Sequence, residues 1–156
     1  MSNLSAPKDP IQNLIYRKAV LTACLDDKAA QAEFYSRCKK DVIFWLDTFG
    51  WTFAPKLYPT CPDRPFITWQ FQEDVIRRID AAIGKNDLLI EKSRDMGATW
   101  MVMAVFLHRC IFFPSQLFLL GSRKEELVDQ SGDPGCLMWK LDYMLGKLPP
   151  WMRPPI

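Results

Sequence analysis

The sequence predicts an α/β fold, with a parallel sheet flanked by helices and preceded by a helical N-terminal segment. Two short apolar runs, 87–91 (DLLIE) and 116–121 (QLFLLG), have the length and composition of buried strands. A mostly apolar helix is expected between them over 98–113, and a strand–helix–strand order with a long crossover requires parallel strands. An amphipathic helix is expected before this unit at 69–84. A last helix is expected over 123–148, where a Ser-Gly-Asp-Pro-Gly segment can interrupt it.

The N-terminal third has a different character. Apolar side chains at steps of three and four predict helices over 11–25 and 29–48. Four Pro and several aromatic residues without a regular period then predict an ordered connecting loop. The expected organisation is therefore a helical segment over 1–50, a connecting loop over 51–68 and an incomplete α/β domain over 69–156.

Composition excludes several classes of protein. The 156 residues are 49% hydrophobic and 24% charged, which suits a globular chain with a real core. The net charge of +2 is too small to indicate a nucleic-acid or membrane surface by itself. Five Cys without a CxxC pair, together with one His, argue against a disulfide scaffold or a zinc site and favour reduced, cytoplasmic thiols. The polar N-terminus has no signal-peptide pattern, and polar residues interrupt the apolar stretch 96–122, so we expect no membrane span.

The candidate site is the turn between the first predicted strand and the helix that follows it. It consists of Lys92-Ser93-Arg94-Asp95-Met96-Gly97-Ala98-Thr99. Such a turn can surround phosphate oxygens with backbone N–H groups and a helix N-terminus. It departs from the standard GxxxxGK[ST] pattern, since Lys92 stands at the first Gly and Ala98 at the usual Lys.

The chemistry of a phosphate site is nevertheless present in this turn. Lys92 and Arg94 supply cations, Thr99 supplies a hydroxyl for Mg²⁺, and Gly97 allows the backbone to approach a phosphate closely. The plain alternative is a charged strand-to-helix turn capped by Ser93 or Asp95.

On these residues the chain resembles the N-terminal ATPase region of the large terminase subunit of tailed bacteriophages, the motor that packages double-stranded DNA into capsids. Ser93-Arg94-Asp95-Met96-Gly97-Ala98-Thr99 is similar to that family's variant phosphate loop, with Lys92 in a position that some members give to the loop lysine. Phe71-Gln72 matches the family's adenine-recognising pair. Two further similarities lie downstream, at 117–124 and in Leu148-Pro149-Pro150-Trp151-Met152.

The resemblance implies a partial P-loop NTPase fold of the RecA/ASCE type that binds ATP and Mg²⁺. Gln72 would contact adenine, and the loop from Lys92 to Thr99 would hold the phosphates, with Thr99 on the metal. Arg94 would be the candidate catalytic arginine. The implied partners are double-stranded DNA, the portal protein and the small terminase subunit, in the host cytoplasm.

The family's Walker B strand and its C-terminal nuclease domain have no counterpart after Gly121. We therefore expect a truncated chain, or one half of a split protein, with little hydrolysis of its own. A missing C-terminal half supplied as a separate chain is a further implied partner. Two other classes of function stay open. One is a helicase-like or kinase-like nucleotide-binding fragment, and the other is a non-catalytic interaction module with a vestigial phosphate loop.

Overall fold

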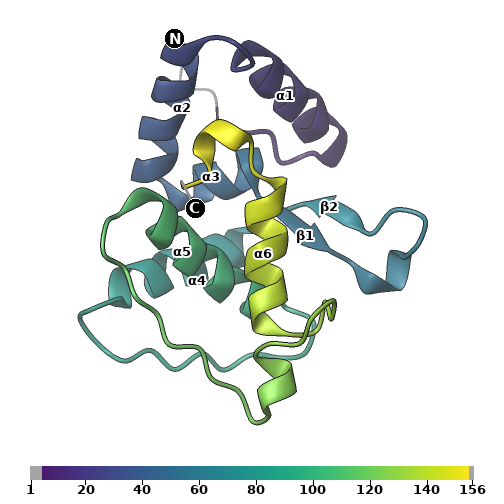
Figure 1. Ribbon diagram of the computed structural model, residues 1–156, viewed down its shortest axis with the longest axis vertical. Coiled ribbons are helices and arrows are strands. Elements are labelled where there is room, and N and C mark those ends of the chain that lie inside the picture. The colour runs from purple at the N-terminus through teal and green to yellow at the C-terminus, as the bar shows by residue number, and fades with distance from the viewer. Residues whose placement is uncertain (1–4, 155–156) are drawn as a thin grey trace. The chain divides into compact units, whose positions relative to one another are not determined.

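The computed structural model describes residues 5–154, and this part of the chain is mainly helical (Figure 1). The α-helices are α1 (Pro10–Ala23), α2 (Lys28–Lys40), α3 (Val42–Phe49), α4 (Gln70–Ala82), α5 (Ala98–Phe112) and α6 (Leu137–Lys147). Three short 3₁₀ helices are η1 (Pro55–Leu57), η2 (Glu125–Leu127) and η3 (Pro150–Met152). The strands β1 (Trp51–Phe53) and β2 (Asp63–Pro65) pair antiparallel, with Trp51 opposite Pro65.

The predicted parallel sheet, and with it the P-loop NTPase fold, is wrong. Within residues 5–154, the segments 87–91 and 116–121 are irregular, and the β1–β2 hairpin lies in the segment predicted to be a loop. Leu89 is 95% exposed and Leu119 is 98% exposed, so neither segment is covered as a central parallel strand must be. The error arises because an apolar run of only five or six residues shows no periodicity. Such a run can be a β-strand or an extended loop that buries one face, and the sequence alone does not distinguish the two. In the segment 116–121, the ring of Phe118 stacks on the ring of Phe106 in α5, and their centroids are 4.2 Å apart.

The chain forms two compact units. Within the described range, unit 1 comprises residues 5–68 with 147–154, and unit 2 comprises residues 69–146. No helix of the described residues is both long and apolar enough to cross a membrane.

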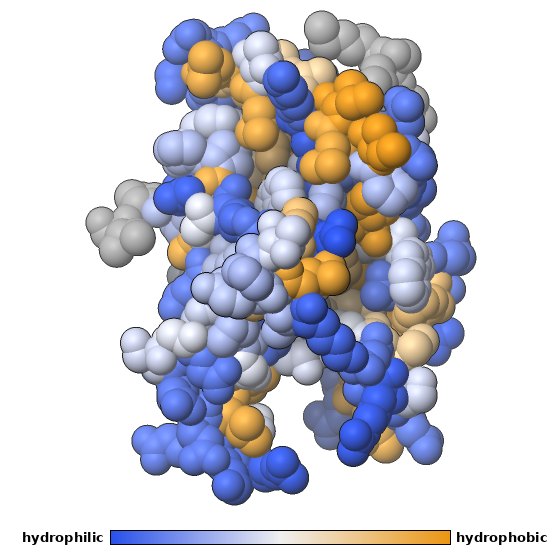
Figure 2. Space-filling model, turned by 90° about the vertical axis from the view of Figure 1, so that its right-hand side faces the viewer, coloured by the Kyte–Doolittle hydropathy of each residue, from blue (hydrophilic) through white to orange (hydrophobic). Residues whose placement is uncertain are grey.

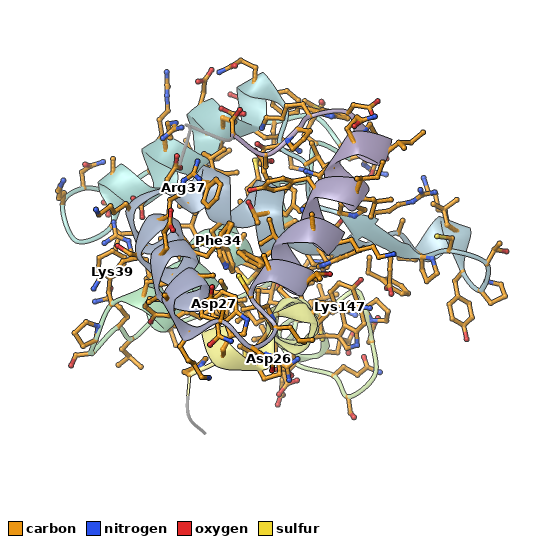
Figure 3. All side chains as sticks on the ribbon, turned by 90° about the horizontal axis from the view of Figure 1, so that it is seen from above. Asp26, Asp27, Phe34, Arg37, Lys39 and Lys147 are labelled. Atoms are coloured by element: carbon orange, nitrogen blue, oxygen red, sulfur yellow. The ribbon has the colours of Figure 1, made fainter. Side chains whose placement is uncertain are left out.

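In unit 1, the predicted helix over 29–48 is broken at Asp41. Asp41 ends α2 and begins α3, because its carboxylate accepts hydrogen bonds from the backbone N–H groups of Ile43 and Phe44. The break turns the apolar α3 into the centre of the unit, where all eight of its residues are buried. Figure 3 shows Phe34 of α2 on the inner side of its helix, where its ring lies 6.3 Å from that of Phe44.

A buried polar network joins α1 to the end of α3. The guanidinium of Arg17, which is 4% exposed, donates to the carbonyl oxygens of Leu46, Asp47 and Gly50 and to Oδ1 of Asn13. These carbonyls lie at the C-terminal end of α3, where a helix leaves acceptors unsatisfied and where its dipole favours a cation. Arg17 therefore stabilises both the end of α3 and the position of α1.

In unit 2, α4 and α5 pack against each other and run in the same direction. Gln72 in the first turn of α4 contacts Met96 just before α5. Near the other ends, Nε of Arg109 lies 2.6 Å from Oδ1 of Asp80. The connection from 83 to 97 must therefore return along the length of the helix pair, which brings the turn before α5 back to the start of α4.

Candidate functional site

The structure brings together Gln72 and the turn before α5, two features that the sequence predicts as parts of one site. Gln72 is in the first turn of α4 and is 9% exposed. Its Oε1 accepts a hydrogen bond from the backbone N–H of Trp69 at 3.1 Å. Its Nε2 donates to the carbonyl oxygen of Met96, 24 residues later, at 3.4 Å. Gln72 thus fixes the start of α4 and also lies against the turn.

Gly97 makes this close approach possible. It adopts the left-handed conformation, with φ of 75°, as the residue immediately before α5. A Cβ atom at this position would lie 3.2 Å from Nε2 of Gln72, so a side chain there would displace the glutamine. Asp95 is also left-handed, with φ of 62°, and the turn is therefore tightly curved on both sides of Met96.

The start of α5 is free of a capping side chain. Gly97 caps the helix without a side-chain hydrogen bond, so the alternative in which Ser93 or Asp95 caps α5 is wrong. The first N–H groups of α5 therefore point out of the helix without a side-chain acceptor, at the positive end of the helix dipole. Thr99 lies exposed in this first turn.

The charged side chains of the turn are exposed. Lys92, Ser93, Arg94 and Asp95 all lie at the surface. Within the part of the chain that the structure describes, neither Lys92 nor Arg94 forms an ion pair. Two cations near uncapped helical N–H groups are suited to bind an anion, and the carboxylate of Asp95 partly offsets their charge.

The described residues contain no group of three His, Cys, Asp or Glu side chains arranged to hold a metal ion. Thr99, the residue of the turn expected to contact Mg²⁺, could therefore do so only together with oxygens from a ligand. Among residues 5–154, Arg94 forms no ion pair that would place it for catalysis.

Trp69 is an exposed aromatic residue at the start of α4. It is 64% exposed and is the N-cap residue of α4, three residues before Gln72. The ring of Phe71 lies 5.6 Å away and supports the indole from one side. An exposed aromatic face beside Gln72 is a surface on which a planar base can stack.

A second feature of unit 2, the hydrogen bonds of Lys140 to the turn before α6, could not be predicted from the sequence. Nζ of Lys140 in α6 donates to the carbonyl oxygens of Pro134, Gly135 and Cys136, at 2.8, 2.8 and 3.0 Å. Burial lowers the pKa of this ammonium group. The helix predicted over 123–148 is wrong for its first half: residues 123–136 form turns and the 3₁₀ helix η2, and only α6 is helical beyond them. Lys140 satisfies the carbonyls of the turn just before α6.

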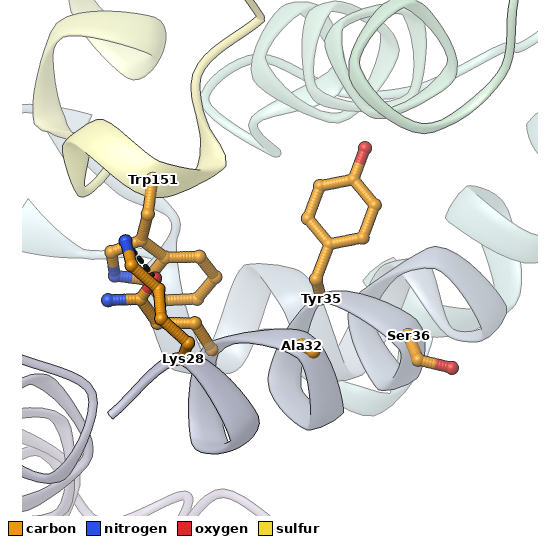
Figure 4. A pocket seen from close by; sticks show the side chains of 6 residues that line it. Lys28, Ala32, Tyr35, Ser36 and Trp151 are labelled. Atoms are coloured by element: carbon orange, nitrogen blue, oxygen red, sulfur yellow. Dashed lines mark hydrogen bonds between the residues drawn. The ribbon is translucent and has the colours of Figure 1, made fainter. Parts of the chain in front are cut away.

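Each unit also has hollows at its surface. In unit 1, the rings of Tyr35 and Trp151 stand on either side of a hollow of about 350 Å³, with Ala32 between them (Figure 4). In unit 2, an apolar hollow of about 370 Å³ is lined by Phe106, Phe118 and neighbouring residues. Neither contains a residue of the predicted site.

Comparison of the chain with protein-family models, with curated proteins and with solved structures finds no match.

Proposed function

We propose that the chain binds ATP at the turn 92–97 and the first turn of α5, as the nucleotide-binding part of a DNA-packaging ATPase of the terminase type. One observation carries this proposal. Nε2 of Gln72 lies 3.4 Å from the carbonyl oxygen of Met96, so the residue expected to contact adenine adjoins the turn expected to contact phosphate. The proposal depends on this local geometry and on the resemblance of the turn, and it requires no parallel sheet.

The turn offers what a polyphosphate needs. Lys92 and Arg94 are exposed cations, and the N–H groups of Ala98 and Thr99 lie at an uncapped helix start. Gly97 has no side chain to obstruct a phosphate oxygen, and it adopts the left-handed backbone conformation without a steric penalty. Ser93 adds a hydroxyl that can donate to phosphate.

Gln72 retains the capacity to recognise adenine. A glutamine amide has two N–H donors and two acceptor lone pairs, and the structure uses one of each. The remaining donor and acceptor match the N7 and N6 edge of adenine, a pairing that glutamine makes in a bidentate manner. Trp69 would stack on the same base.

We propose binding with little hydrolysis. Mg²⁺ would reach the site with the phosphates and contact Thr99, while Arg94 would neutralise charge on the terminal phosphate. The metal-ligating carboxylates and the base that orients water would have to come from elsewhere. Double-stranded DNA, the portal protein and the small terminase subunit remain proposed partners on the resemblance alone.

The test is a titration of the purified chain with a fluorescent ATP analogue in the presence of Mg²⁺. Lys92→Ala should weaken binding by roughly tenfold or more, since a charge-assisted contact contributes about 1.5–3 kcal/mol. Lys85→Ala, which removes an exposed lysine from the turn after α4, is the matched control and should bind like the wild type. Equal affinity for all three proteins would refute the site.

A further inference from the structure

Helix α1 presents its most apolar side chains outward. The exposed fractions are 69% for Ile11, 46% for Leu14, 59% for Ile15, 43% for Leu21 and 73% for Leu25, which lies just beyond the C-cap residue Cys24. We call these five residues the α1 stripe. Figure 2 shows hydrophobic side chains gathered near the top of that view, the height at which Figure 1 labels α1.

The stripe has the spacing of a helix-pairing surface. On α1, Ile11, Leu14 and Leu21 follow each other at steps of three and seven, with Lys18 at the position between Leu14 and Leu21. This is a two-heptad repeat of the kind that inserts side chains into a second helix. The helical part of the stripe, from Ile11 to Leu21, is about 15 Å long at 1.5 Å per residue, which a partner helix of similar length would cover.

The stripe is not needed to hold α1 in unit 1. The opposite face of the helix is the buried one, and it carries Asn13, Arg17, Val20 and Cys24. Asn13 and Arg17 bond to the end of α3, so polar contacts fasten α1 from inside. An open hollow of about 350 Å³ also lies between the stripe residues Leu14, Leu21 and Leu25 and the indole of Trp51.

We propose that the α1 stripe is the docking surface for an amphipathic helix of another protein, with an acidic residue of that helix opposite Lys18. Lys18 is exposed at the middle of the stripe, and it forms no ion pair within residues 5–154. A helix that covers the stripe must remove this ammonium group from water. A carboxylate at the facing position compensates for that loss, whereas an apolar or basic residue does not.

The position of Lys18 argues against a second copy of this chain as the occupant. In a two-fold symmetric pairing of two α1 stripes, residues near the middle of the stripe face their own counterparts. Two Lys18 side chains would then meet within an apolar interface, and like charges in such a place repel.

A membrane surface fits less well. Exposed carboxylates flank the stripe at both ends, with Asp9 before α1 and Asp26 and Asp27 after it. Amphipathic helices that bind anionic lipids are rich in Lys and Arg on their polar face, whereas Lys18 is the one exposed basic residue of α1.

The test uses the full chain and two synthetic amphipathic peptides of about two to three heptads. Both carry Leu and Ile at the core positions, and they differ only in a central Glu or Lys. The wild type should bind the Glu peptide roughly tenfold more tightly than the Lys peptide. Lys18→Glu, an exposed substitution, should reverse this order, and the Lys85→Glu control should leave it unchanged. Leu21→Asn should weaken the binding of both peptides.

Three results would overturn the proposal. The first is the absence of binding to either peptide by a chain whose circular dichroism shows it to be folded. The second is a preference between the peptides that does not depend on residue 18. The third is a stable wild-type dimer in sedimentation velocity, or binding to vesicles of anionic phospholipid, that Leu21→Asn abolishes, because this would assign the stripe to a second copy or to a membrane. Nucleotide binding at the turn in unit 2 is measured separately, so failure here leaves that proposal standing.

Discussion

Replacing Arg17 tests the claim that a buried guanidinium joins α1 to the end of α3. Arg17→Met keeps most of the side-chain length but removes four hydrogen bonds, to Asn13, Leu46, Asp47 and Gly50. The three backbone acceptors are not orphaned. The carbonyl of Leu46 still accepts from the N–H of Gly50, that of Asp47 from Nδ2 of Asn13, and that of Gly50 from the N–H of Phe66.

The expected loss of stability in Arg17→Met depends on the hydrogen bonds that are lost and on the buried charge that is removed. Each hydrogen bond from a charged donor contributes about 1.5–3 kcal/mol, but removal of a buried charge recovers part of its desolvation cost. We expect the free energy of unfolding to fall by about 2–4 kcal/mol, a large share of the total for a small protein. The neighbouring Lys18→Met removes an exposed charge from the same helix and should change stability by no more than about 0.5 kcal/mol.

Urea unfolding followed by tryptophan fluorescence and circular dichroism measures both variants. Burial lowers the pKa of Arg17 to about 10, and the neighbouring Asp47 opposes this shift. In the unfolded chain Arg17 keeps its proton to a higher pH than in the folded chain. The free energy of unfolding therefore rises with pH on account of this group, but only once the pH approaches 10. The difference between wild type and Arg17→Met should therefore be constant from about pH 6 to pH 9. A loss below about 1 kcal/mol, or one equal to that of Lys18→Met, would refute the proposed role.

Three further outcomes are expected. Lys140→Met should destabilise unit 2 by about 1–3 kcal/mol in the same unfolding assay, since three carbonyl oxygens lose their donor; an unchanged midpoint would contradict this. Alkylation with iodoacetamide near pH 8, followed by peptide mass spectrometry, should modify the exposed Cys61 first. Cys38 should resist, because burial raises the pKa of its thiol, and comparable rates for the two would be inconsistent with the structure. Gly97→Ala and Gly84→Ala each place a side chain at positive φ, at a cost of about 1–2 kcal/mol. Only Gly97→Ala should weaken nucleotide binding, because no atom lies within 4 Å of a Cβ at Gly84.

The helices could be predicted from periodicity, because their apolar side chains repeat on one face. The prediction over 69–84 is confirmed by α4, and the one over 98–113 is confirmed by α5. Gly84 follows the end of α4 with φ of 72°, as expected for a glycine after a helix C-terminus. The break at Asp41 was missed because the apolar pattern continues through it, although an aspartate before an apolar run is a recognised N-cap.

The parallel sheet could not be judged from local sequence. Whether 87–91 and 116–121 form strands depends on neighbouring segments that supply hydrogen bonds and cover their apolar side chains. Those neighbours are set by the tertiary structure and not by the local sequence. The position of Gln72 against the turn was expected only through the resemblance. The contacts of Lys140 and Arg17 were not predicted, since a single basic residue in a helix carries no pattern that distinguishes a buried donor from a surface charge.

The most direct test of the proposed site is a titration of the isotopically labelled chain with Mg²⁺ and ATP, followed by amide resonances. We predict saturable shifts at the backbone amides of Gly97, Ala98 and Thr99 and at the side-chain amide of Gln72, with the amide of Gly132 unmoved as an internal control. Shifts that are absent at saturating ATP, or confined to residues away from the turn and Gln72, would contradict the assignment of this turn as a nucleotide site.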